Sequence, residues 1–414
     1  MNIYLVIILA ILIGDYLLNL VVENLNIKNI KTQLPKEYEG CYDSEKYDKA
    51  QTYLKEGTRF ALFKNSFFTA VIILFIITGG FNFVDEIARA FQRGPILTGL
   101  IFAGVIMFGI QLLNIPFSIY HTFVIEEKYG FNRTTPRTFI LDRIKMWILG
   151  GIIGGIIFAG VVWFFRELEN VAWIYCWIGV TIAQLFLAFI APVVIMPLFN
   201  KFIPLEDGQL KTAIKKYADS QKFKIKGIYK IDASRRSSKS NAFFVGFGKY
   251  RRIGLFDTLI EKQTAGELVS VLAHEVGHYK KNHIIKDLLI SVLATGLMFF
   301  ILSFFINNPG LFAAFRMKNL SIYASLFFFG FLYTPISLLI SVIGNVVSRK
   351  HEYEADKYAV TTCGVSEDFI TALKKLTVDN LSNLTPHSLK VFLEYSHPPV
   401  LKRIEAIRAM RLDA

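Results

Sequence analysis

Long apolar runs alternate with polar segments throughout this sequence. Seven of the runs are long enough to span a bilayer as helices, which takes roughly 20 mostly apolar residues. They lie at about 3–22, 66–84, 98–120, 146–165, 173–199, 288–306 and 320–347. Two long polar segments, about 200–287 and 348–414, are expected to fold outside the membrane. The sequence therefore predicts a mainly α-helical, polytopic membrane protein.

The loops between these runs alternate between many and few basic residues. Three loops carry eight, five and eighteen Lys and Arg residues, in 23–65, 121–145 and 200–287. The other three carry two, one and two, in 85–97, 166–172 and 307–319. Cytoplasmic loops collect Lys and Arg. The alternation therefore predicts an N-terminus outside, a C-terminus in the cytoplasm, and both long polar segments on the cytoplasmic side.

The first polar segment contains short stretches rich in β-branched and aromatic residues, which favour strands. The stretches are Lys226–Ile231, Ala242–Phe247 and Arg252–Phe256. We expect a small antiparallel sheet with Gly246, Gly248 and Lys249 near a turn. The residues from Thr264 to about Phe305 are predicted to form one long helix that continues into the sixth span.

That helix carries an HExxH motif. His274 and His278 are four residues apart, so both imidazoles project from one face and can bind one Zn²⁺. Glu275 is placed to take a proton from a zinc-activated water as general base. The alternative is a chance match, but the apolar stretch 268–273 before the motif indicates a partly buried helix rather than a charged surface. The motif predicts zinc-dependent hydrolysis of a peptide bond.

A catalytic zinc needs a third protein ligand, and the residues alone leave the choice open. Glu352 follows the seventh span, on the same side as the HExxH motif, and shares a helix face with Asp356 four residues later. His351 and His283 are the alternative ligands. Glu354 is expected to point away from the site. A plain charged helix at the membrane boundary would explain the same stretch without any metal.

Composition narrows the class of protein. Apolar residues make up 53% of the chain, charged residues 19%, and Phe occurs 38 times. These values exclude a soluble, disordered or collagen-like protein. Three cysteines without a CxxC pair argue against a disulfide framework and a thiolate zinc site. The net charge of +13 is explained by the cytoplasmic loops, and no nucleic-acid-binding motif accompanies it.

Four motifs in this order resemble the type I CAAX prenyl proteases, which are integral-membrane zinc metalloproteases of the gluzincin kind. They are HEVGH at 274–278, SRKHEYEAD at 348–356, SSKSNAFFVGFGKYRRIGLFDTLI at 237–260 and SHPPVLKRI at 396–404. With the seven spans, the resemblance extends over nearly the whole chain. It implies that His274, His278 and Glu352 bind one zinc ion and that Glu275 is the general base.

The resemblance also implies roles for four further residues. Asp356 would be a proton donor or a support for a ligand histidine. His397 and Arg403 would donate hydrogen bonds to the oxyanion or anchor a substrate carboxylate; without the resemblance, His397 would be read as a helix-start residue. Asn241 would line the substrate cleft. If the strand after Asn241 is an edge, a peptide can pair with it; the alternative is a turn residue.

The implied architecture is a ring of seven helices around an intramembrane chamber that a cytoplasmic α+β zinc domain closes. The division expected along the chain is 1–199 with five membrane helices, 200–287 with the HExxH helix, 288–347 with helices six and seven, and 348–414 with the third ligand. The expected activity is cleavage near the C-terminus of prenylated, CaaX-type peptides or proteins at the lipid bilayer, by a monomer that binds no nucleic acid.

Two other functions would fit parts of the sequence. The same zinc site with a looser cleft would suit a quality-control protease for membrane proteins. A transporter with an incidental HExxH would need broken helices in paired spans. Gly150, Gly151, Gly154 and Gly155 in the fourth span are better explained by close helix packing. The short outer loops and the absence of a retrieval signal at the C-terminus favour a prokaryotic-type protein of the bacterial inner membrane over the endoplasmic reticulum.

Overall fold

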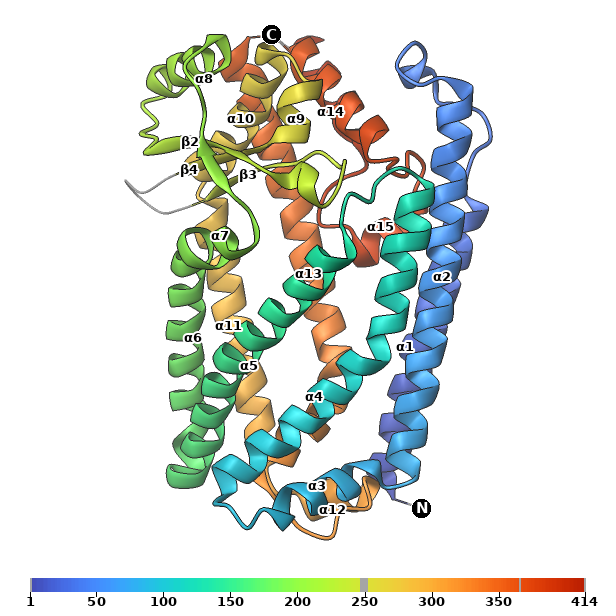
Figure 1. Cartoon of the computed structure of the whole chain (residues 1–414), viewed down its shortest axis with the longest axis vertical. Helices are drawn as coiled ribbons and strands as arrows, with labels where there is room; N and C mark the ends of the chain where they lie inside the picture. The colour runs from blue at the N-terminus through green and yellow to red at the C-terminus, as the bar shows by residue number, and fades with distance from the viewer. Residues whose placement is uncertain (1, 246–251, 365, 413–414) are drawn as a thin grey trace.

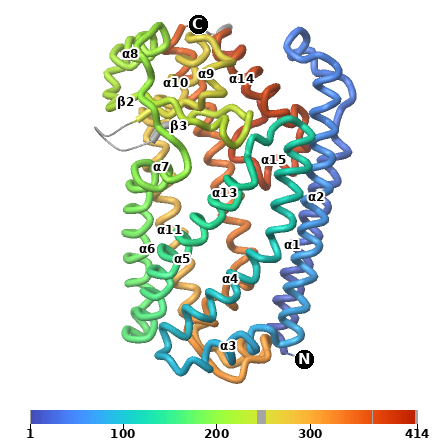
Figure 2. Tube along the Cα trace, viewed as in Figure 1, coloured from blue at the N-terminus to red at the C-terminus, as the bar shows by residue number. Residues whose placement is uncertain are grey.

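The computed structural model describes residues 2–245, 252–364 and 366–412. Seven helices in this described part are long and apolar enough to cross a membrane, which confirms the seven predicted spans. They are α1 (Ile3–Lys28), α2 (Ser44–Ile77), α4 (Pro95–Tyr120, continued by the π-helical turn η2, His121–Glu126), α5 (Pro136–Glu167), α6 (Ala172–Ile190, continued by η4, Ala191–Ile195, and α7, Met196–Phe199), α11 (His283–Ser303) and α13 (Ile322–Cys363). The chain begins and ends at opposite ends of the molecule (Figures 1 and 2), as an odd number of spans requires.

The second predicted span, 66–84, is divided in the structure. α2 begins before this range and ends at Ile77. Gly79 has a φ of 79°, a left-handed conformation that glycine adopts without strain. The chain turns there, and α3 (Gly80–Ala90) lies with α12 (Pro309–Ala314) across the end of the helix bundle opposite the sheet (Figure 1).

The four glycines of α5 do not lie at a tight helix contact. A Cβ added at Gly150, Gly151 or Gly154 would meet no atom within 4 Å, and one at Gly155 would meet Leu100 at 3.7 Å. The glycines instead line an apolar cavity of about 530 Å³ together with residues of α4. The expectation of close packing is therefore wrong, because here the missing side chains leave space open rather than bringing two backbones together.

A small mixed sheet lies outside the membrane helices. Its four strands, in the order β1-β2-β4-β3, are β1 (Phe202–Pro204), β2 (Gly227–Ile231), β3 (Ala242–Val245) and β4 (Arg252–Phe256). The prediction of an antiparallel sheet is wrong at the centre, where β2 and β4 pair in parallel; the two outer pairs are antiparallel. β1 was not predicted. The expected turn at Gly246, Gly248 and Lys249 lies outside the described residues, as does Phe247.

The predicted helix from Thr264 to Phe305 is broken in two. A capping box between Thr264 and Glu267 starts α10 (Ala265–Lys280). Asn282 then adopts a φ of 57°, which ends the helical path, and α11 begins at the next residue. Asparagine tolerates this left-handed conformation better than most residues. The membrane helix α11 is therefore a separate helix from α10.

The two polar segments share one apolar core. It is built by α8 (Gln209–Ser220), α9 (Asp257–Lys262), α10, α13, α14 (Ser366–Asp379), α16 (Val400–Leu412) and strands β2 and β4. α15 (Ser388–Glu394) lies beside α13 and α1. Because α13 contributes to this core and also crosses the membrane, the HExxH motif and the membrane bundle are parts of one packed structure.

α10 and α13 approach very closely at one glycine. A Cβ added at Gly277 would lie 3.0 Å from the Cα of Ala355 and 3.1 Å from its carbonyl oxygen. Both atoms belong to backbone, which cannot move aside as a flexible side chain would. The glycine of the HEVGH motif therefore sets how near the histidines of α10 can come to the acidic residues of α13.

Candidate active site

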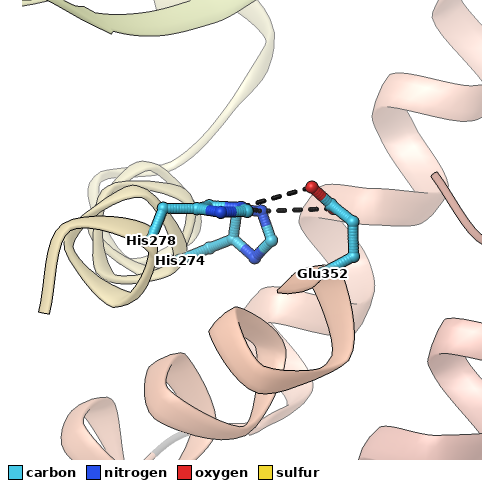
Figure 3. A group of neighbouring side chains, drawn as sticks. All are labelled: His274, His278 and Glu352. Atoms are coloured by element: carbon cyan, nitrogen blue, oxygen red, sulfur yellow. Dashed lines mark hydrogen bonds and ion pairs between the residues drawn. The ribbon is translucent and has the colours of Figure 1, made fainter. Parts of the chain in front are cut away.

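Two histidines of α10 face the acidic stretch of α13 (Figure 3). His274 and His278 lie one helical turn apart near the C-terminal end of α10. Their Nε2 atoms are 3.1 Å apart. His274 is buried, whereas His278 is partly exposed. Two imidazole nitrogens held this close offer a pair of ligands to a single metal ion.

Glu352 brings a carboxylate to the same point. Its oxygens lie 3.5 Å from Nε2 of His274 and 3.2 Å from Nε2 of His278. Ligand atoms about 2.0–2.2 Å from a tetrahedral zinc are separated by about 3.3 Å, so the observed distances fit zinc. Oε2 of Glu352 is buried and makes no hydrogen bond within the described chain. Its two oxygens each face one imidazole, Oε2 that of His274 and Oε1 that of His278, as a carboxylate ligand of a shared metal ion would.

The other nitrogen of His274 is held by Asp356. Nδ1 lies 2.9 Å from Oδ1 of this fully buried carboxylate. Arg403 donates to both oxygens of Asp356, at 2.6 Å from Nη2 and 2.9 Å from Nε, and its Nη1 lies 3.4 Å from Glu352. Such an outer carboxylate fixes the ring orientation of a ligand histidine. The geometry suits Asp356 and Arg403 for support of the ligands, since both are buried away from solvent.

The carboxylates shape the protonation of this cluster. Burial lowers the pKa of His274, but the hydrogen bonds that its ring donates to Asp356 and Glu352 outweigh burial and raise the pKa to about 9. Burial likewise opposes the charge on Arg403, whereas the neighbouring Asp356 and Glu352 raise its pKa above the ordinary value. Without a metal, the site therefore holds positive charge on His274 and Arg403 against two acidic groups.

His278 has a support that the sequence did not reveal. Its Nδ1 lies 3.1 Å from Nδ1 of His283, and Nε2 of His283 lies 3.0 Å from Oε2 of Glu354. Glu354, which was expected to point away from the site, thus reaches it through His283. The only available signal was the spacing of five residues between the two histidines. The bend at Asn282 makes this contact possible.

The structure places the two alternative third ligands away from the Nε2 atoms. His283 contacts the opposite edge of the His278 ring. The ring of His351 stacks on that of His283 at a centroid distance of 4.0 Å, and its Nδ1 lies 3.2 Å from Asp287. Of the three candidate third ligands, Glu352 is the one whose carboxylate lies close enough to His274 and His278 to bind the same metal ion.

Two further predicted residues border this group. Nε2 of His397 lies 3.3 Å from Oε1 of Glu352, and 65% of the His397 side chain is exposed. It therefore faces the open side of the site. Glu275 is partly buried on α10, and its charge contributes to the raised pKa of Arg403. The structure thus brings an exposed imidazole and a further carboxylate into the surroundings of the three ligand-type side chains.

Asn241 lies just before the strand at the edge of the sheet. It is exposed, and its Oδ1 accepts a hydrogen bond from the amide of Ala242 at 2.8 Å. β3 pairs with β4 on one side and is the last strand in the sheet order. Contacts between β3 and α10 place this edge beside the helix that carries the histidines.

Two protein-family models together match nearly the whole chain. Residues 24–201 match a family model described as the CAAX prenyl protease N-terminal region with five membrane helices. Residues 204–411 match the model of peptidase family M48. The chain belongs to peptidase family M48. As an M48 peptidase it is a metalloendopeptidase, and its membrane helices imply a lipid bilayer.

Relatives of this M48 peptidase cover most of its length. "Probable CAAX prenyl protease 1" of Schizosaccharomyces pombe is 36% identical over 88% of this chain and 80% of its own. "CAAX prenyl protease 1 homolog" of Arabidopsis thaliana is 36% identical over 90% of both chains. The crystal structure of S. mikatae Ste24p matches with a TM-score of 0.93 and 32% identity, over 98% of this chain and 99% of that one. These relatives are eukaryotic and do not support the expectation of a prokaryotic-type protein.

Proposed function

We propose that this M48 peptidase is a zinc endopeptidase that cleaves near the C-terminus of prenylated, CaaX-type proteins or peptides. The observation that carries the proposal is the group formed by His274, His278 and Glu352, whose ligand atoms have the spacing of a tetrahedral zinc site. The substrate class follows from relatives named CAAX prenyl protease 1 that align over most of the chain.

The residues around the ligands divide the chemistry among them. A zinc ion held by His274, His278 and Glu352 would act as a Lewis acid and make water nucleophilic near neutral pH. Glu275 takes the proton of the attacking water and returns it to the leaving amine. His397 is exposed beside Glu352, where it donates a hydrogen bond to the developing oxyanion. Asp356 and Arg403 keep His274 in the orientation that presents Nε2 to the metal.

The edge strand supports a mode of substrate binding. An extended peptide that pairs with β3 continues the sheet and gains backbone hydrogen bonds. Asn241, exposed at the start of this strand, is placed to contact the peptide near the scissile bond. We therefore assign Asn241 to substrate binding and expect its replacement to raise KM more than it lowers kcat.

The distribution of basic residues supports a cytoplasmic position for this site, with the N-terminus outside. One chain supplies all three ligand-type side chains and their supports, which favours a monomer as the active form.

A cleavage assay tests the proposal. The purified protein in detergent is given two peptides of the same CaaX sequence, one farnesylated and one not, alongside the Glu275→Ala variant. We expect cleavage that favours the farnesylated peptide and falls about 10²–10⁴-fold in the variant, the usual contribution of a general base. Equal cleavage of both peptides would replace prenyl recognition by broad membrane proteolysis. Undiminished cleavage by Glu275→Ala would remove the proposed base.

Metal analysis tests the ligand assignment separately. Glu352→Ala should lose most of the bound zinc, whereas His121→Ala, an exposed histidine on η2, should keep it. Glu275→Ala should also retain zinc, because Glu275 is a base and not a ligand. A full equivalent of zinc in Glu352→Ala would show that another side chain completes the site.

A further inference from the structure

A charged cavity lies at the end of the helix bundle opposite the candidate metal site formed by His274, His278 and Glu352. It has a volume of about 420 Å³. Arg89 at the end of α3, Arg93 in the link to α4, and Arg166 at the end of α5 all line it. This end of the chain is poor in basic residues, since its three loops carry only two, one and two Lys or Arg. Three of these few cations nevertheless converge on one cavity.

The guanidinium groups of the cavity are not fully neutralised. Nε of Arg89 lies 2.7 Å from the buried carboxylate of Asp85. Nε of Arg166 lies 3.3 Å from Glu167, and both side chains are about half exposed. The structure gives Arg93 no acidic partner among the described residues. The cavity therefore has two acidic neighbours for three arginines and an excess of positive charge.

Two helix N-termini add to this positive field. α4 begins at Pro95 after Gly94, and α13 begins at Ile322 after Ser321; neither has a side-chain cap or an acidic residue in its first turn. Pro95 and Ile322 both line the cavity. The free N–H groups of a helix start carry partial positive charge. The arginines and the two helix starts are all positive, so they repel one another. An anion bound in the cavity would be attracted both by the arginines and by the helix starts.

A buried hydroxyl in the same wall also lacks a well-aligned partner. Ser321 lines the cavity, its residue is 8% exposed, and its Oγ is buried without a hydrogen bond of normal geometry to the described chain. The hydroxyl of Tyr323 interacts with it but donates its own proton to Asp85. An unpaired buried hydroxyl costs free energy unless a ligand satisfies it. Together with the arginines, Ser321 supplies the donors that an oxyanion with several acceptor oxygens needs.

We propose that this cavity binds the phosphate group of an anionic phospholipid. Arginine forks match phosphate oxygens in geometry as well as charge, and uncapped helix starts bind phosphate through backbone N–H groups. The lipid, rather than a soluble phosphate, is favoured by position. The cavity lies where the membrane helices α4, α5 and α13 all reach one end of the bundle, which is the level of the lipid headgroups.

Lipid titration of the delipidated protein tests the site. Native mass spectrometry would follow binding of phosphatidylglycerol and of phosphatidylcholine to wild type, Arg93→Gln and Lys318→Gln. Lys318→Gln removes the same charge at the same end but lies outside the cavity lining. We expect wild type and Lys318→Gln to bind phosphatidylglycerol more tightly than phosphatidylcholine, and Arg93→Gln to lose about tenfold in affinity, as for one charged hydrogen bond.

The outcomes separate the site from its occupant. Equal affinity of wild type and Arg93→Gln for phosphatidylglycerol, or an equal loss in Lys318→Gln, would overturn the proposal. If inorganic phosphate stabilises wild type but not Arg93→Gln against heat while neither lipid binds, the lipid as occupant is overturned. Retained peptide cleavage by Arg93→Gln in the same detergent shows that the variant is folded.

Discussion

His274 is held between two carboxylates that favour its protonated form. Its pKa is raised to about 9 because Asp356 and Glu352 outweigh the effect of burial. A zinc ion requires the neutral imidazole. In the proposed zinc site, protons and metal therefore compete for this one side chain, and the competition is strongest where the histidine is protonated, below a pH of about 9.

Zinc uptake at neutral pH should release a proton from His274. We expect the metal-free protein at pH 7 to release about one proton per zinc, and zinc affinity to rise with pH until the pH passes about 9. Calorimetry in buffers of different ionisation enthalpy measures the proton directly. A binding enthalpy at pH 7 that is the same in every buffer would contradict the raised pKa.

His283 should affect zinc affinity without being a zinc ligand. It contacts His278 on the far side of the ring and is itself anchored by Glu354. We expect His283→Ala to weaken zinc affinity about 10–100-fold, as loss of an outer-sphere partner does. His121→Ala, an exposed histidine on η2, is the control. Unchanged zinc affinity in His283→Ala would show that the contact with His283 does not orient the ring of His278.

At the scale of elements, the contact between α10 and α13 decides how the ligands meet. Gly277 lets the backbone of α10 pack against Ala355. We expect Gly277→Ala to cost about 1–3 kcal/mol of stability through overpacking and to weaken zinc binding, because the helices must separate. Thermal unfolding with and without zinc measures both effects.

A matched glycine gives the control for this contact. A Cβ at Gly57 in α2 would meet no atom within 4 Å, so Gly57→Ala should be neutral or stabilising, as for alanine in an open helix. If Gly277→Ala behaved like Gly57→Ala, the close approach of α10 and α13 would not control the site.

The elements that the sequence predicted well are those set by local pattern. The membrane spans follow from apolar length alone, and the pairing of His274 with His278 follows from a spacing of four residues on one helix. The helix break at Asn282 was missed because the helical pattern continues across it. A single left-handed residue leaves no trace in hydrophobic periodicity.

Long-range pairing explains the other differences. β3 follows β2 in the chain but takes the edge of the sheet, while β4 pairs in parallel with β2. Strand order depends on contacts between distant segments, which a single sequence does not encode locally. The support of His278 by His283 and Glu354 was missed for the same reason, since it depends on the bend at Asn282 and on a residue 71 positions away.

At the scale of the whole molecule, the candidate metal site and the membrane bundle share α13. This helix runs without interruption from Ile322 to Cys363 and carries Glu352 beyond its apolar part. Its 42 residues extend about 63 Å, roughly twice the hydrocarbon thickness of a bilayer. A change in the tilt of α13 that α10 does not follow would therefore move Glu352 relative to the histidines of α10.

We therefore expect bilayer thickness to affect catalysis through the tilt of α13. Helices adjust their tilt to hydrophobic mismatch at a cost of fractions of a kcal/mol per Å. We expect zinc affinity in nanodiscs to peak at one acyl-chain length and to fall on either side. Constant affinity across chain lengths would show that the core around α10 isolates the site. A protein built in this way would process its substrates at different rates in thin and thick membranes without any regulatory domain.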